Sequence, residues 1–378
     1  MVPLKDVVVL DLTRILAGPF CTMMLADYGA DVIKIEPPQG DDTRRWGPPF
    51  IKGESAYFLS VNRNKRSIVL DFHADPDRRR FLKMVEDADV VVENYRPGTM
   101  ARWGFDYDKL ATLNPRLIMA SISGLGATGP GRHRPGYDVV AQALAGLMAV
   151  TGDGSSPIKA GFSVADIGAG MWAAFGIMVA LWARERSGQG QWIDTSLYES
   201  LISWQTYLAG NFFATGEEPR PLGSAHPNIA PYQALKAQDG ALIVACGNDA
   251  LWEKMVAACD IPFGEDPHFQ TNADRVRHRQ ELVDRLEAEI FSHNTLSHWL
   301  DRLAAAGVPA APIQNFRQVF QDPQVLFRQM LTTVVHPVAG EISQLGIPVK
   351  LSATPGAVRT APPLLDEHRA DIIRQFGL

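Results

Sequence analysis

The chain contains little cysteine and no dense run of basic residues. Its three cysteines lie far apart in 378 residues, none in a CxxC pair, and its nine histidines lack the spacing of metal ligands. We therefore expect a reducing compartment and no metal site. The net charge of −6 argues against nucleic acid as a partner.

Three motifs of other α/β enzymes are also missing. The first strand–helix turn, Thr13–Pro19, is not GxGxxG, and no phosphate-binding GxxxxGKS/T occurs in the chain. Binding of NAD or ATP phosphates therefore has no support. A serine–histidine–acid hydrolase has none either, because there is no GxSxG turn.

No segment predicts membrane insertion or secretion. The N-terminus enters a strand-like run at once, without a signal-peptide pattern. The longest apolar stretch, Ile167–Ala183, is just short of the roughly 18 residues of a membrane span. We interpret it as a buried core helix and expect a cytoplasmic protein, or one in a mitochondrial matrix after loss of a presequence.

What the chain does contain is an alternation of short β-branched runs and helical stretches in its first half. This pattern predicts an α/β fold with a mostly parallel, Rossmann-like sheet covered by helices. The expected strands are Val7–Leu12, Asp31–Glu36, Ser67–Phe72, Asp89–Asn94 and Leu117–Ile122. The expected helices between them are Phe20–Tyr28 and Pro76–Asp87.

A second, smaller α/β domain follows a linker rich in proline and glycine, Pro219–Pro231. We place this domain at residues 223–315, after a large domain at 1–218. Its expected elements are a strand at Ala241–Ala245, helices at Leu251–Ala258, Arg275–Phe291 and Leu296–Ala306, and an extended run at Val308–Ile313. Residues 316–378 form a C-terminal segment that ends in an amphipathic helix, Glu367–Phe376.

Polar loops follow several of the predicted strands. Ligands of open α/β sheets bind beyond the carboxyl ends of the strands, so Arg14–Ala17, Asn94–Pro97 and Ser123–Gly126 are expected near one crevice. Tyr95 could stack on a flat ring, and Arg96 or Arg102 could hold a phosphate. These segments could equally be plain surface loops.

Two further segments are candidates for contact with a substrate. The loop Gly124–Gly129, which contains Gly126, could be a lid or a long turn, and Tyr137 follows it. His226 in the linker could meet a substrate carboxylate, or could be an ordinary exposed histidine.

The acidic residue Asp166 stands at the start of the apolar helix. It could cap that helix by accepting backbone N–H groups of the first turn. The same position would keep its carboxylate ionised and directed out of the helix, where it could act as a nucleophile. This stretch alone leaves both interpretations open.

Taken in order, seven motifs make the chain resemble the family III CoA-transferases (the CaiB/BaiF family). The motifs are Val9–Pro19, Gly29–Glu36, Asn64–Asp71, Ala88–Gly98, Asn114–Ile118, Gly136–Asp138 and Ala165–Gly170. Gly223–Pro227 and Ala230–Ala234 look most like the succinate–hydroxymethylglutarate branch. The resemblance implies an interlocked homodimer of ring-shaped chains, in which the C-terminal segment returns to the large domain.

The resemblance also implies that Asp166 is a covalent nucleophile, that CoA thioesters are substrates and that no cofactor is tightly bound. CoA would move from an acyl-CoA, with succinyl-CoA as the expected donor, to a free carboxylic acid, with a small dicarboxylate as the expected acceptor. The loop Gly124–Gly129, or N–H groups at the helix start, would stabilise the oxyanion.

The CoA-contacting positions of formyl-CoA transferase are only partly matched. Ala17, Leu70, Asn94 and Arg102 match them, whereas Leu16 stands in place of a glutamine and Pro37 in place of an arginine. These departures, and the missing glycine-rich substrate loop, argue against oxalate and formyl-CoA as the physiological pair.

Two alternative functions remain. An acyl-CoA α-methyl racemase would need a histidine where this chain has Tyr137, and an ordinary tyrosine is a poor base at neutral pH. A non-catalytic acyl-CoA-binding protein would not need Asp166.

Overall fold

The computed structural model describes residues 2–378, which form two compact units. Unit 1 contains the chain up to Leu147, then Lys159–Glu217 and Pro323–Leu378. Unit 2 contains Met148–Ile158 and Glu218–Asp322. Each unit is therefore built from segments that are separated in the sequence.

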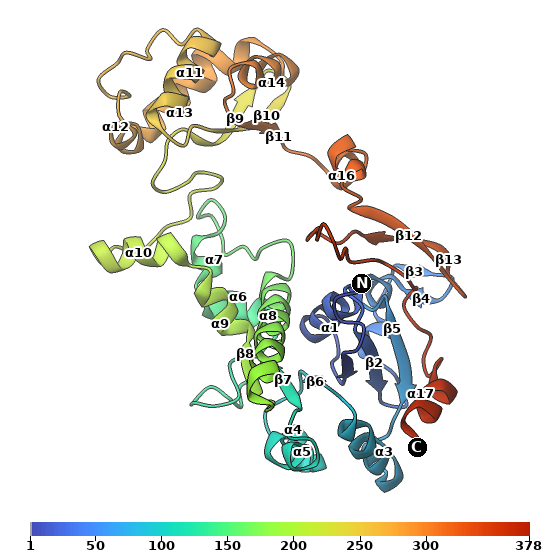
Figure 1. The fold of residues 1–378 in the computed structure, drawn as a ribbon. Helices are drawn as coiled ribbons and strands as arrows, with labels where there is room; N and C mark the ends of the chain where they lie inside the picture. Colours follow the sequence, from blue (N-terminus) through green and yellow to red (C-terminus); the bar gives the residue numbers. More distant parts are fainter. Residues whose placement is uncertain (1) are drawn as a thin grey trace. The chain divides into compact units, whose positions relative to one another are not determined.

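A six-stranded parallel sheet forms the centre of unit 1 (Figure 1). Its strands, in spatial order, are β5 (Lys65–Val69), β2 (Asp31–Glu36), β1 (Val8–Asp11), β6 (Val90–Glu93), β7 (Ile118–Ser123) and β8 (Trp192–Ser196). The order reverses between β1 and β6, because the chain builds outward in one direction from β1 and in the other from β6. Such a reversal opens a crevice at the carboxyl ends of the two central strands.

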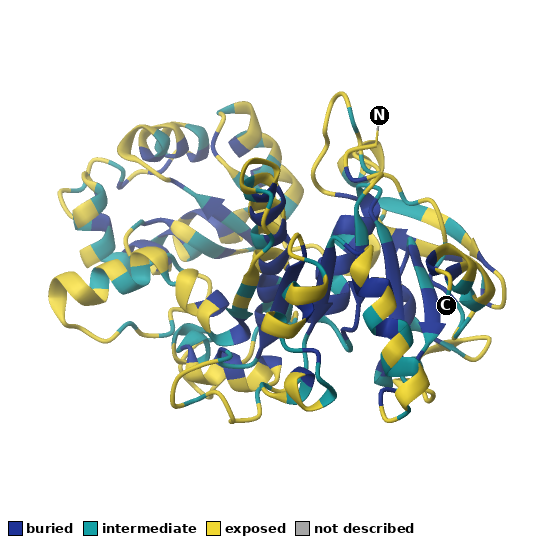
Figure 2. Ribbon diagram, turned by 60° about the horizontal axis from the view of Figure 1, so that its bottom comes forward, coloured by how far each residue is buried: buried dark blue, intermediate teal, exposed yellow. Residues whose placement is uncertain are grey.

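The strands are apolar on both faces, as expected for a parallel sheet covered by helices. Val9 and Val90 belong to one buried cluster, with α1 and α8, whereas their neighbours Leu10 and Val91 belong to a second cluster on the opposite face, with α3. Figure 2 shows these strands as the most continuously buried part of the unit. The predicted parallel α/β sheet is confirmed.

The other elements of unit 1 are helices and two small hairpins. The helices are α1 (Ala17–Asp27), α2 (Ala56–Val61), α3 (Asp75–Glu86), α4 (Thr99–Trp103), α5 (Tyr107–Leu113), α6 (Asp138–Leu144), α8 (Val164–Ser187), α9 (Leu197–Ser203), α10 (Thr206–Thr215), α16 (Pro323–Phe327) and α17 (Arg369–Phe376). The hairpins pair β3 (Phe50–Ile51) with β4 (Glu54–Ser55) and β12 (Leu331–His336) with β13 (Gly340–Leu345). Helix α7 (Leu147–Val150) crosses the boundary between the units. The sequence analysis did not predict either hairpin.

The C-terminal helix α17 packs against edge strand β5. The His368 N–H donates to the Ser67 carbonyl at 3.0 Å, and the Val69 N–H donates to Asp366 Oδ1 at 2.7 Å. Ile372 and Phe376 are buried in the second cluster of the sheet. The last segment of the chain is therefore part of unit 1.

Helix α8 is longer than the apolar run that predicted it. Its 24 residues would suffice, by length and composition, to cross a membrane, but half of its most apolar window is buried inside the protein. Ala165, Ala169, Ala173 and Ile177 pack in the first core cluster. One such helix is weak evidence for a membrane span, because a core helix of a soluble protein meets the same criterion.

Unit 2 contains a three-stranded antiparallel sheet, β11 (Ala310–Pro312), β10 (Gly240–Ala245) and β9 (Tyr232–Ala237). Its helices are α11 (Asp249–Cys259), α12 (Asn272–Arg277), α13 (Arg279–Arg285), a π turn at Leu286–Ile290, a 3-10 turn at Phe291–His293, α14 (Leu296–Ala305) and α15 (Phe316–Val319). Strand β9 was not predicted from the sequence.

The single helix predicted over Arg275–Phe291 is wrong. The chain breaks it at His278, between α12 and α13. On one side of the break, the buried guanidinium of Arg275 donates to the carbonyls of Ala230 and Phe269 at 2.7 and 2.8 Å. On the other side, Arg279 donates to the carbonyls of Ile229 and Pro227 at 3.2 and 3.0 Å. A buried guanidinium needs such partners, and both helices are bonded to the segment before β9 in this way.

Candidate active site

The loop that follows β1 is held in an unusual conformation. Asn94, which follows β6, accepts from the Arg14 N–H at 2.8 Å and donates to the Arg14 carbonyl at 2.7 Å. The next residue, Ile15, has a φ of 71°, which a β-branched side chain rarely adopts. Its N–H faces both carboxylate oxygens of Asp41 at 3.3 Å. The surrounding bonds thus impose a strained backbone at the end of the central strand.

Beneath this loop lie four buried charged residues, Asp11, Lys34, Asp41 and Lys65, which we call the lysine network. Lys34 Nζ donates to Asp41 at 2.9 Å and to the Thr13 carbonyl at 2.9 Å, and Lys65 Nζ donates to Asp11 at 3.0 Å. Burial by itself would raise the pKa of Asp41. Lys34 and hydrogen bonds from Thr43 outweigh it and hold that pKa at about 2.

Asp166 reaches the same sheet edge because α8 packs very closely against its neighbours. A Cβ atom at Gly170 would lie 2.4 Å from the Ala17 carbonyl oxygen in α1, and one at Gly168 would lie 2.5 Å from the Ser200 hydroxyl in α9. Only glycine fits at these two positions without a shift of the neighbours. The glycines of the Ala165–Gly170 motif therefore set the position of the first turn of α8.

Of the two interpretations of Asp166, the structure excludes that of a helix cap. Ser163 is the N-cap residue, and Asp166 is the third residue of the helix. The capping bond comes from Asp138, whose Oδ1 accepts from the Ala165 N–H at 2.9 Å. Its Oδ2 accepts from Gln142 at 2.6 Å. Asp166 is thereby left without a capping function.

Contrary to the expectation that the helix start keeps Asp166 ionised, the surroundings of Asp166 favour its protonated form more than those of an ordinary aspartate. Burial, together with the nearby charge of Asp138, raises the pKa of Asp166 to about 7. The lysine network does not offset this, because Asp166 forms no ion pair with either of its lysines. The carboxyl group is therefore poised to exchange its proton near neutral pH.

Tyr57 belongs to the same environment and was missed in the sequence. Burial and the charges of Asp166, Asp41 and Asp138 raise its pKa to about 12. Its ring packs edge-on against Trp46, with 5.2 Å between ring centroids. Its phenol is therefore a neutral hydrogen-bonding group near Asp166.

A cavity of about 310 Å³ opens at the carboxyl ends of β1 and β6, with Asp166 in its wall. Seven of the predicted binding residues line it: Leu16, Ala17, Asn94, Tyr95, Arg96, Gly124 and Tyr137. Tyr137 is 62% exposed. These loops therefore meet at one cavity, as the strand-end rule predicts.

Positive charge surrounds the cavity. Arg14, Arg96, Arg132 and Arg134 line it, and two of these, Arg132 and Arg134, were not singled out in the sequence. The only feature of the sequence that could have indicated them is the repetition of arginine just after the loop Gly124–Gly129. Guanidinium groups suit phosphates and carboxylates because they can donate two parallel hydrogen bonds.

Four predicted residues do not line this cavity. Leu70 lines a neighbouring cavity of about 170 Å³ together with Pro37, Tyr95 and Trp103. Arg102 instead donates to the Thr99 hydroxyl at 2.9 Å, and the Gly126 N–H donates to Ser123 Oγ at 2.9 Å. His226 belongs to unit 2, where its ring contacts Tyr232. Since Tyr95 lines both cavities, it connects them.

Comparison with known proteins shows what the chain as a whole is similar to. The model of CoA-transferase family III matches residues 4–369. The chain is 41% identical to succinyl-CoA:glutarate CoA-transferase of Mus musculus, over 99% of this chain and 86% of that protein. It is also 41% identical to acetyl-CoA:oxalate CoA-transferase of Acetobacter aceti, over 99% and 96% of the two chains.

A solved structure has the same fold. The crystal structure of a CAIB/BAIF family protein from Brucella suis superposes with a TM-score of 0.88, at 41% identity, over 99% of both chains.

Proposed function

The chain belongs to CoA-transferase family III, and we propose that it transfers CoA between carboxylic acids through a covalent intermediate on Asp166. The observation that carries this proposal is the position of Asp166. It is a half-buried carboxyl group in the wall of a cavity lined by guanidinium groups, at the point where the strand order of the sheet reverses.

The chemistry begins when the Asp166 carboxylate attacks the thioester carbonyl of the donor. The CoA thiolate leaves and a mixed anhydride forms between the donor acyl group and Asp166. The thiolate then attacks the Asp166 carbonyl, which releases the donor acid and forms an aspartyl-CoA thioester. The acceptor carboxylate then attacks the aspartyl thioester, which releases the CoA thiolate and forms a second mixed anhydride. The thiolate attacks the acceptor carbonyl of this anhydride, so that the acceptor leaves as its CoA thioester and Asp166 is regenerated.

The raised pKa of Asp166 suits this role. A carboxylate with a pKa of about 7 is a stronger base than an ordinary one, and removal from water increases its nucleophilicity further. Tyr57 and the N–H groups around Gly124 are the candidates that stabilise the oxyanion.

For the substrates, we propose succinyl-CoA as donor and a small dicarboxylate as acceptor. Relatives named for succinyl-CoA with glutarate or with mesaconate support this assignment. The four arginines of the cavity offer partners for a second carboxylate as well as for CoA phosphates. A relative of equal identity is named for acetyl-CoA and oxalate, so overall identity does not decide the acid.

We also propose a homodimer, interlocked as in the family, in the cytoplasm or a mitochondrial matrix. Its support is an apolar face of α8 that unit 1 leaves exposed: Met171, Phe175, Val179 and Trp182 are 47%, 62%, 50% and 64% exposed. Contiguous exposed apolar residues of this size favour burial against another chain. Sedimentation of the purified protein as a monomer at micromolar concentration would exclude the dimer.

The test is a mass-spectrometric transfer assay. Succinyl-CoA is offered with glutarate, mesaconate, 3-hydroxy-3-methylglutarate, malate, itaconate, citramalate, oxalate or carnitine. We compare wild type with Asp166→Ala and with Asp301→Asn, an exposed aspartate of unit 2. The proposal expects a new acyl-CoA from wild type and Asp301→Asn only.

Each other outcome would contradict a particular part of the proposal. Transfer that survives in Asp166→Ala would exclude a covalent mechanism on Asp166. Transfer to none of the acids would exclude succinyl-CoA as the donor. Exchange of the α-proton of a 2-methylacyl-CoA in deuterated water, without transfer, would indicate a racemase. Acyl-CoA binding without any turnover would indicate a binding protein.

A further inference from the structure

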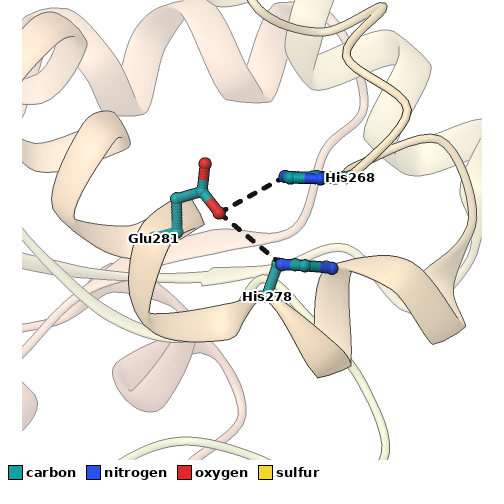
Figure 3. Close-up of side chains that lie close together, drawn as sticks. All are labelled: His268, His278 and Glu281. Atoms are coloured by element: carbon teal, nitrogen blue, oxygen red, sulfur yellow. Dashed lines mark ion pairs between the residues drawn. The ribbon is translucent and has the colours of Figure 1, made fainter.

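Away from the cavity, unit 2 brings together two imidazoles and a carboxylate (Figure 3). His268 lies in the segment between α11 and α12, His278 lies between α12 and α13, and Glu281 is on α13. Their potential ligand atoms all lie within 4.8 Å of one another. Figure 3 shows both rings beside the same carboxylate oxygen of Glu281. The sequence analysis did not bring these three residues together, because His268 lies on a separate loop.

The distances within this group suit ligands of one metal ion better than hydrogen-bonded partners. The Nδ1 atoms of His268 and His278 lie 3.5 and 3.6 Å from Glu281 Oε2. A charge-assisted hydrogen bond would be about 2.7–2.9 Å long. Two ligands of a tetrahedral zinc ion, each bonded at about 2.0–2.2 Å, lie about 3.4 Å apart. The gaps are therefore close to those that a zinc ion would span.

The backbone already holds the two histidines in place. The His268 N–H donates to Asp266 Oδ1 at 2.9 Å, and the next residue, Phe269, is fully buried. The His278 N–H donates to the Asp274 carbonyl at 2.9 Å. Ordered ligands lower the entropic cost of binding an ion.

The rings themselves need a small adjustment. They stack 4.1 Å apart with 3° between their planes, so their in-plane lone pairs do not converge on one point. One ring must turn out of the stack to bind an ion together with the other. His268 has the room to do so, since its side chain is 53% exposed.

The kind of donor selects the kind of metal. Two imidazoles and a carboxylate suit Zn²⁺ and similar transition ions, whereas Mg²⁺ and Ca²⁺ prefer sets made only of oxygen. In residues 2–378 the ion-pair partners of Glu281 are these two histidines, so no arginine or lysine competes for its carboxylate. We propose that His268, His278 and Glu281 bind one Zn²⁺ ion, with water in the fourth position, and that this ion ties the segment before α12 to α13.

Calorimetric titration of the full chain, stripped with a chelator and dialysed, tests the site. ZnCl₂ is expected to bind once per chain, and MgCl₂ at the same concentrations is expected not to bind. His268→Gln and Glu281→Gln should each weaken zinc binding at least about tenfold. His293→Gln, which removes an exposed histidine of the same unit outside the group, should leave zinc binding unchanged.

Thermal melting controls for misfolding of the variants. Without metal, all variants should melt close to wild type, and an excess of ZnCl₂ should raise the melting temperature of wild type and His293→Gln only. Equal zinc binding by wild type and Glu281→Gln would overturn the proposal, and so would equal affinity for magnesium. Loss of binding in His293→Gln would place the ion elsewhere and would overturn it too.

Discussion

Two groups of aspartates in unit 1 have opposite properties. In the lysine network, Asp11 and Asp41 face Lys65 and Lys34, and these cations lower the pKa of both acids although burial opposes it. At the start of α8, Asp166 has the charge of Asp138 near it, and burial and that charge raise its pKa to about 7. We call Asp138 and Asp166 the α8 acid pair. Aspartate is therefore kept ionised in the lysine network, whereas at the start of α8 Asp166 has a pKa close to neutral pH.

The difference indicates which acids support the fold and which can react. The lysine network holds the strained loop after β1, because Asp41 accepts from the Ile15 N–H and Lys34 donates to the Thr13 carbonyl. A carboxylate that is fully engaged by cations is a poor nucleophile. Asp166 has no such engagement in the network, so its lone pairs remain available for a carbonyl carbon.

Replacing Asp166 should have the largest effect of any single change. We expect Asp166→Asn to lower the rate of CoA transfer by about 10⁴-fold or more, because no covalent intermediate can form. The measurement is the initial rate of transfer with the acid that wild type accepts. A loss of less than about tenfold would place the nucleophile elsewhere.

Breaking the lysine network should instead reduce stability. We expect Lys34→Met to lower the free energy of unfolding by about 3–5 kcal/mol, because it leaves the Asp41 carboxylate buried without its cation. Urea denaturation followed by circular dichroism measures the change.

An exposed ion pair provides the control for that experiment. Arg374→Met removes the partner of Asp371 where both side chains are mostly exposed, and it should cost less than about 1 kcal/mol. Equal losses in the two variants would mean that the network does not hold the fold. The double variant Lys34→Met/Asp41→Asn should recover part of the loss, since it removes the unpaired charge.

Much of this arrangement could be predicted from the sequence, because it depends on local patterns. Runs such as Val90–Val92 specify buried parallel strands, and the strand-end rule then places Arg14–Ala17 and Asn94–Pro97 at one cavity. The resemblance to a family singled out Asp166. None of these steps required knowledge of side-chain contacts.

The contacts that tune the site could not be predicted in the same way. Asp138 caps α8 from 27 residues upstream, and a local capping rule therefore assigned that role to Asp166. Tyr57 lies on the short helix α2, for which the sequence analysis made no prediction. Asp138 comes close to Asp166 because α6 packs on α8, whereas Tyr57 lies on α2, which packs on α1. A linear pattern specifies neither packing.

The contribution of Asp166 to stability should depend on pH in the direction opposite to that of an aspartate in an ordinary ion pair. The pKa of Asp166 is about 7 in the folded protein and near 3.8 in the unfolded chain. The folded state therefore binds the proton more tightly, and the stability due to this group is present below pH 4 and is lost as the pH rises through 7.

Asp166→Asn should consequently be more stable than wild type at pH 8, by about 1–2 kcal/mol once partial exposure is allowed for. The difference should disappear towards pH 4. Urea denaturation of both proteins at several pH values measures it. A variant less stable than wild type at pH 8 would show that Asp166 is not penalised by its surroundings.

The smallest expected effect separates the two causes that raise the pKa of Asp166. Since only the carboxylate attacks the thioester, kcat/KM for the donor should fall on the acid side with an apparent pKa of about 7. Asp138→Asn removes the like charge but leaves Asp166 buried, and Asn retains the oxygen that accepts from the Ala165 N–H. The acid limb should therefore move to lower pH while remaining above the ordinary range of an aspartate.

Titration of the substrates affects wild type, Asp138→Asn and Asp301→Asn equally. Asp301→Asn is the control, and its profile of kcat/KM against pH should match that of wild type. An unchanged profile in Asp138→Asn would mean that burial alone sets the pKa of Asp166. The contrast with the lysine network would then rest on solvent exclusion rather than on the sign of the neighbouring charge. A shift to higher pH would contradict the assignment of Asp138 as a repelling charge, because removal of a negative neighbour can only favour ionisation of Asp166.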